Sequence, residues 1–131
     1  MTAATVGRFR AARRDPARVV LEGLHAVKHA LRFGAAIETA VSPDPPAAVA
    51  LAASLAPDVA PRLEALLEPV ERAVFDQLAP APPATGLLAI AARPPTGEPA
   101  TRPDRPLVVL DGPSHLGNLG AAIRVAAAAD A

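Results

Sequence analysis

A stretch rich in proline divides this chain and constrains its fold more than any other feature. The segment "RPPTGEPATRPDRP", residues 93–106, holds five prolines in fourteen residues. Proline fixes φ and lacks a backbone N–H, so this density excludes a regular helix or a paired strand and is typical of a linker. We therefore expect one domain over 18–93, a linker over 94–106, and the start of a second domain over 107–131.

Helical and strand patterns alternate through the first of these domains. Strands are predicted over 18–21, before a turn at Glu22-Gly23, and over 35–42 and 85–92. Helices are predicted over 24–33, 46–56 and 61–79, the last divided by Pro69. In the first helix Leu24, Val27 and Leu31 recur at helical spacing, and Gly34 is placed to end it. This alternation predicts a small layered α/β domain.

Composition limits the class of protein. With 51% hydrophobic and 20% charged residues, the chain is expected to be globular. The absence of cysteine excludes disulfides and thiolate metal sites. No apolar run has the length of a membrane span or a signal peptide, so we expect a cytoplasmic protein without a membrane partner. His25 and His29 have helical spacing, but "HAVKH" lacks the glutamate of a zinc protease motif, so no metal is expected.

The net charge of zero hides an asymmetry along the chain. Residues 1–35 hold seven basic and two acidic residues, a net charge of +5, and the remainder carries −5. We expect residues 1–17 to form a flexible basic tail next to a basic helix face, where a polyanion can dock. A solvated tail with no ligand is the alternative interpretation. The candidate RNA-binding residues are Arg10, Arg13, Arg14, Arg18, His25, Lys28, His29 and Arg32.

The last 25 residues predict a β-loop-α unit, with a buried strand over 107–110 and a helix from Leu119. Gly117 and Gly120 allow close approach of a ligand, and Asn118 is placed to cap the helix. Arg124 is the single charged residue of the apolar stretch 119–129. We therefore expect this helix to be buried on most sides, so that the guanidinium must meet an anion, an acid or solvent. An arginine that snorkels to the surface is the simpler alternative.

The stretch "LDGPSHLGNLGAAIRVAAAADA" resembles the first motif of the SpoU/TrmH-type RNA methyltransferases of the SPOUT superfamily, whose form is close to LDxxxDPxNxGxxxRTAxxxGA. Asn118, Gly120 and Arg124 fall on its asparagine, glycine and arginine. "VVLEGLHAVKHALRFGAAI" (19–37) and "PATGLLAIAARPP" (83–95) resemble the start and the last strand of that family's substrate-binding domain. The chain departs from the family at His115-Leu116, where Asp-Pro is common, and at Thr85, where glutamine is usual.

This resemblance implies transfer of a methyl group from S-adenosylmethionine to a ribose 2′-hydroxyl of rRNA or tRNA. Arg124 and Asn118 would be the catalytic residues, Arg124 favouring the alkoxide and Asn118 positioning RNA or supporting the loop. The domain over 18–93 would bind the RNA. The absence of Trp and Tyr argues against broad base-stacking platforms, so recognition is expected to depend on phosphate and shape.

The resemblance also implies that the cofactor pocket and a homodimer interface lie in a trefoil-knotted, Rossmann-like domain whose later motifs follow this sequence. We therefore expect the chain to be the N-terminal portion of an enzyme and inactive alone. Two alternatives stay open: a stand-alone RNA-binding α/β module without catalysis, and a soluble α/β protein with no nucleic-acid role.

Overall fold

The computed structural model describes residues 2–95, 97 and 101–131. The chain comprises two compact units, Met1–Pro95 and Thr96–Ala131. The first is a mixed α/β domain built on a four-stranded sheet, and the second contains one helix among its described residues. The linker expected over 94–106 includes residues 96 and 98–100, which lie outside the described residues.

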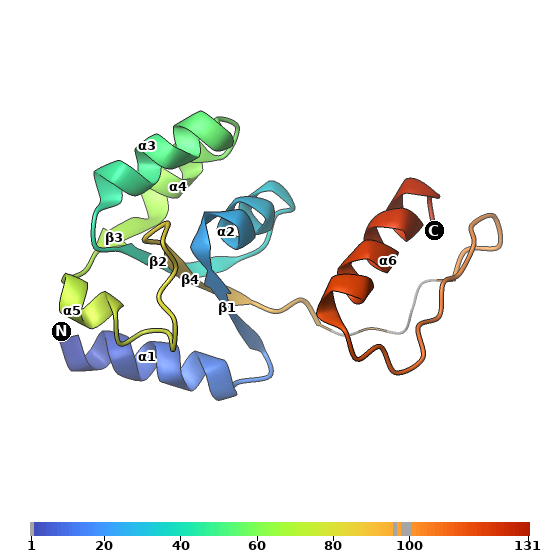
Figure 1. The fold of residues 1–131 in the computed structure, drawn as a ribbon, viewed down its shortest axis with the longest axis horizontal. Coiled ribbons are helices and arrows are strands. Elements are labelled where there is room, and N and C mark those ends of the chain that lie inside the picture. Colours follow the sequence, from blue (N-terminus) through green and yellow to red (C-terminus); the bar gives the residue numbers. More distant parts are fainter. Residues whose placement is uncertain (1, 96, 98–100) are drawn as a thin grey trace. The chain divides into compact units, whose positions relative to one another are not determined.

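The sheet of the first unit has the strand order β1-β4-β2-β3 (Figure 1). Its strands are β1 (Arg18–Glu22), β2 (Ile37–Ser42), β3 (Leu67–Pro69) and β4 (Leu88–Ala92). β4 pairs antiparallel with β1 and β2, and β2 pairs parallel with β3. Every residue of β4 except the half-buried Ala92 is buried, because β4 is central and both faces of the sheet are covered by helices.

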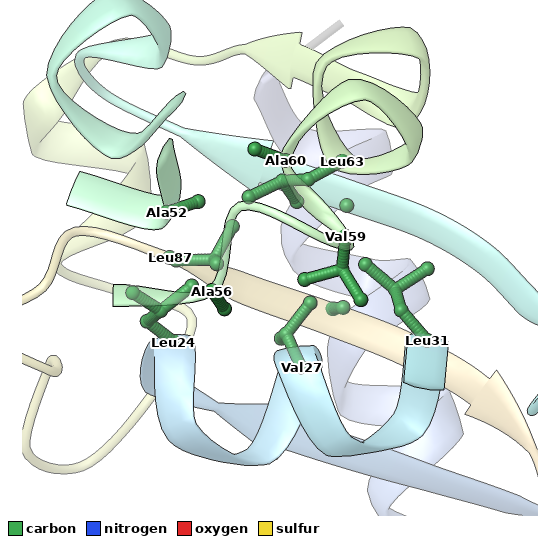
Figure 2. Close-up of a cluster of buried hydrophobic side chains, with 11 residues drawn as sticks. Leu24, Val27, Leu31, Ala52, Ala56, Val59, Ala60, Leu63 and Leu87 are labelled. Atoms are coloured by element: carbon green, nitrogen blue, oxygen red, sulfur yellow. The ribbon is translucent and has the colours of Figure 1, made fainter. Parts of the chain in front are cut away.

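One face of the sheet is covered by α2 (Gly23–Arg32), α3 (Pro45–Leu55) and α4 (Ala60–Leu66). The inward stripe of α2, predicted as Leu24, Val27 and Leu31, packs on the sheet and on side chains of α3 and α4 (Figure 2). α3 begins where Asp44 accepts a hydrogen bond from the backbone N–H of Ala47, with prolines in the first turn.

The sharp junction between β1 and α2 depends on two residues. Gly23 has φ +85°, and a Cβ placed there would lie 3.2 Å from Thr85 Oγ1. That hydroxyl accepts a hydrogen bond from the backbone N–H of Leu24 at 3.1 Å and so caps the first turn of α2 from another loop. Thr85, a departure from the resembled family, therefore has a structural role in this chain.

The opposite face of the sheet is covered by α1 (Thr2–Arg14) and α5 (Arg72–Phe75). Val6, Phe9 and Ala12 of α1 are buried against α5 and the sheet. The prediction of a flexible tail over 1–17 is therefore wrong for the described residues of that range, because their apolar side chains recur every three residues and cover the sheet.

Three further predictions differ from the structure in whole or in part. Pro69 does divide the helical pattern over 61–79, but a short edge strand, β3, stands at the division, paired with β2. Residues 107–110 form no strand and are exposed, because the described part of the second unit offers no strand to pair with them. The helix of that unit, α6 (Leu116–Ala128), begins three residues earlier than predicted.

Candidate nucleic-acid interface

The end of α1 and the start of β1 form an arginine-lined pocket of about 410 Å³. Arg13, Arg14 and Arg18 line it, as does Arg93, which the sequence analysis did not select. Arg18 pairs with Ala92 in the sheet register, so Arg93 lies beside it at the end of β4. We call these four residues the arginine pocket. The sequence does show that Arg93 directly follows a predicted strand, and the pairing of that strand with β1 is what brings Arg93 to this pocket.

Internal ion pairs neutralise part of this charge. Arg13 Nη2 lies 2.8 Å from Glu22 Oε1 and donates to the carbonyl of Leu78 at 2.9 Å. The Arg18 guanidinium binds the carboxylates of Asp15 and Glu38. The pKa of Asp15 is lowered, mainly by the hydrogen bond from the Ala17 N–H and to a smaller extent by the hydrogen bond from Arg18. These two arginines therefore hold α1 to the sheet.

The remaining cations of this region are unpaired. Arg14 and Arg93 make no ion pair within the described part of the chain, and both are exposed. Arg10 is exposed on α1 and is likewise without an ion-pair partner among the described residues. Arg14 and Arg93 are thus the members of the pocket that an external phosphate can reach without displacing a carboxylate.

The second group of predicted residues lies on the outer side of α2, away from its buried stripe. We call His25, Lys28, His29 and Arg32 the α2 face. Arg32 makes a two-point ion pair with Asp58, with both N···O distances 2.8 Å. This contact lowers the pKa of the Asp58 carboxyl. Lys28 has no ion-pair partner within the described residues.

The imidazole of His29 is less basic than a free histidine. Partial burial, followed by repulsion from His25, Lys28 and Arg32, lowers its pKa. The lowered pKa favours the neutral ring near pH 7, so His29 adds little positive charge to the α2 face.

The structure separates the two groups of candidate residues. α1 packs on one face of the sheet with Val41, Leu88 and Ile90, whereas α2 packs on the other with Ala40 and Ala89 (Figure 1). The expectation that the helix face lies next to the basic N-terminal segment is therefore wrong. The eight predicted residues form two surfaces instead of one continuous face.

The motif residues of the second unit lie on α6. His115 is the N-cap residue of α6 and Asn118 lies in its first turn, so the prediction that Asn118 caps the helix is wrong. Six residues separate Asn118 from Arg124, which places their side chains about 120° apart around the helix axis. α6 therefore does not bring these two groups together by itself.

Arg124 is exposed, and α6 has no buried residue, so the predicted buried helix is not observed. Among the described residues Arg124 has no ion-pair partner, which leaves its guanidinium open to an external anion. Gly117 supports the loop, since a Cβ there would lie 3.1 Å from the ring of His115, whereas a Cβ at Gly120 would meet nothing within 4 Å.

An open pocket of about 490 Å³ lies between residues 101–110 and α6. Apolar side chains and Arg102 and Arg105 line most of it. Arg105 is paired at 2.8 Å with Asp130, and no acidic side chain is among the residues that line the pocket. S-adenosylmethionine carries cationic amino and sulfonium groups, and these residues offer them no unpaired carboxylate, so they do not fit that cofactor.

The described residues contain no group of three or more histidines, aspartates or glutamates arranged to hold a metal ion. They also contain no helix with the length and apolar character needed to cross a membrane.

Comparison with known proteins finds no matching family model, no matching curated protein and no matching solved structure.

Proposed function

We propose that this chain is the N-terminal portion of an RNA methyltransferase of the SpoU/TrmH type, which methylates a ribose 2′-hydroxyl of rRNA or tRNA. The observation that carries the proposal is the order Asn118, Gly120, Arg124 on a helix, α6, in a unit that follows a separate α/β unit. In this proposal the first unit binds RNA and the second begins the methyltransferase domain.

The exposed Arg124 supports the catalytic role. A ribose hydroxyl is a poor nucleophile near neutral pH because it is hardly ionised. A permanently charged guanidinium beside it lowers the free energy of the alkoxide and holds the ribose in place. No carboxylate in the described part of the chain competes for Arg124, so this charge is available to RNA. Asn118 supports the loop or positions RNA.

The cations of the first unit support RNA binding. Arg10, Arg14, Lys28 and Arg93 have no ion-pair partner among the described residues, so phosphates can bind them with release of counterions. The partly neutralised Arg13, Arg18 and Arg32 contribute less. S-adenosylmethionine does not fit the residues present here, so in this proposal residues outside this sequence hold it.

The unpaired cations of the first unit also support a second candidate function, an RNA-binding α/β module without catalysis. The reading frame past the codon for Ala131 separates the two. The methyltransferase proposal expects it to encode a glycine-rich motif and an asparagine-containing motif, whereas a stop codon there supports the binding module.

The catalytic test uses the protein encoded by the whole reading frame, with tritiated S-adenosylmethionine and purified rRNA or tRNA. Arg124→Ala is expected to lower the methylation rate at least about 100-fold, the usual effect of losing one group that stabilises a developing oxyanion. Arg102→Ala, a second exposed arginine of the same unit, is the matched control and should retain the rate. Equal rates for the two variants would remove Arg124 from the mechanism.

A further inference from the structure

Three rings form a row along the outer side of α2. The ring centroids of His25 and His29 are 4.7 Å apart in an edge-on arrangement, and those of His29 and Phe33 are 6.1 Å apart with planes only 11° from parallel. The spacing of four residues places each ring one helical turn after the last. We call these three residues the α2 ring row.

Phe33 ends this row in an unusual environment. It directly follows α2 as its C-cap residue and is 81% exposed, the most exposed phenylalanine of the three in the chain. Phe9 and Phe75, by contrast, are fully buried in the core. Phe33 therefore contributes little to folding and presents an aromatic ring to solvent.

Cations flank the α2 ring row. Lys28 and Arg32 lie one turn apart on the same outer side of the helix, and α2 contains no acidic residue. Asp58 holds the Arg32 guanidinium in a fixed orientation at 2.8 Å. An aromatic ring with adjacent cations complements a ligand that has both a flat π-face and phosphates.

We propose that the α2 ring row is a stacking site for an unpaired base of an RNA strand, with Phe33 as the platform and Lys28 against a flanking phosphate. This inference rests on the RNA binding proposed above and adds the class of RNA, single-stranded instead of duplex. A duplex hides the base faces that a ring can stack on, whereas a loop or an end exposes them. The neutral ring of His29, favoured by its lowered pKa, extends the platform behind Phe33.

The chain offers a direct reporter for this contact because it contains no Trp and no Tyr. Phe33→Trp places a single indole at the proposed platform, and Leu55→Trp places one at the exposed end of α3 as the matched control. A short oligouridylate is expected to quench the fluorescence of Phe33→Trp and leave that of Leu55→Trp unchanged. Inorganic polyphosphate, which has charge but no bases, should quench neither.

Affinity measurements separate stacking from simple apolar contact. By fluorescence anisotropy of labelled oligouridylate, Phe33→Ala and Phe33→Leu are expected to bind about tenfold more weakly than wild type, and Phe33→Trp to retain binding. Binding of an RNA duplex should change less than twofold in all three. Because Phe33 is 81% exposed, these substitutions leave the fold in place.

Two different failures can be told apart. If wild type binds oligouridylate but Phe33→Ala binds it equally well, or both indoles are quenched alike, the stacking site is refuted and RNA binding by other residues stands. If wild type binds neither oligouridylate nor duplex at low salt, both the stacking site and the proposed RNA binding are refuted.

Discussion

Phe9→Ala tests whether α1 is part of the folded domain. Phe9 is 1% exposed and packs with Val6, Ala12 and residues of α5 and the sheet. Truncation of a fully buried phenylalanine costs about 3–5 kcal/mol, from lost burial and the cavity that remains. Small domains are stable by only about 5–15 kcal/mol, so this change removes a large part of the total.

The expected change can be converted to a melting temperature. The first unit has 95 residues, and an unfolding entropy of about 2.1 cal/mol/K per residue gives about 5 °C for each kcal/mol. Phe9→Ala should therefore lower the Tm by about 15–25 °C in thermal melts followed by circular dichroism. Phe33→Ala is the matched control, the same substitution at an 81% exposed ring, and should shift the Tm by less than about 3 °C. If Phe9→Ala lowers the free energy of unfolding by less than about 1 kcal/mol, α1 does not pack on the sheet as described, and the flexible tail predicted from the sequence is the better description.

Two further predictions concern charge and the second unit. Asp58→Asn should tighten RNA binding and steepen its salt dependence, because it frees Arg32 for a phosphate. Since the pKa of Asp58 is lowered in the folded state, its ion pair stabilises the fold above the ordinary pKa of 3.8. The difference in unfolding free energy between wild type and Asp58→Asn should therefore disappear as the pH falls below that value, and a constant difference would contradict the ion pair. Backbone amides of α6 should exchange with deuterium much faster than those of β4, since α6 has no buried residue and β4 is almost wholly buried; equal protection would contradict its exposure.

In the first unit, an element whose apolar residues recur at regular spacing could be predicted from the sequence. The stripe of Leu24, Val27 and Leu31 predicts α2 because burial on one side of a helix selects that spacing. Val6 and Phe9 of α1 have the same helical spacing, yet the many arginines of this segment led us to predict a flexible tail. One of them, Arg13, is paired with Glu22, a carboxylate that comes later in the chain, and a local pattern does not contain such a partner.

Other errors arose because the deciding contact is remote in sequence. The strand β3 has only three residues and exists because β2 offers it a parallel edge. The apolar run over 107–110 has no such edge among the described residues, so its apolar composition alone does not produce a strand. The α2 ring row was missed because counting Trp and Tyr says nothing of two histidines and a phenylalanine placed on consecutive turns.

The topology also predicts how the two RNA-binding surfaces are related. The N–H of Arg93 binds the carbonyl of Ala17, and the N–H of Ala92 binds the carbonyl of Ala36, three residues after Phe33. The arginine pocket and the end of the α2 ring row therefore lie at the same end of the sheet, on its two faces. An RNA strand can contact both surfaces by passing around this end.

Because of this arrangement, the length of the RNA should determine whether it contacts one surface or both. Arg14 and Phe33 lie on opposite faces of the sheet, so the binding free energies lost in Arg14→Ala and Phe33→Ala should add when a long single strand contacts both. An oligonucleotide too short to reach around the sheet binds one surface at a time, so Phe33→Ala should shift it to the arginine pocket and make Arg14→Ala more costly. Additive losses at every length would show that even a short strand contacts both surfaces at once, which contradicts their placement on two faces, and an effect of Phe33→Ala alone would show that the arginine pocket does not bind RNA.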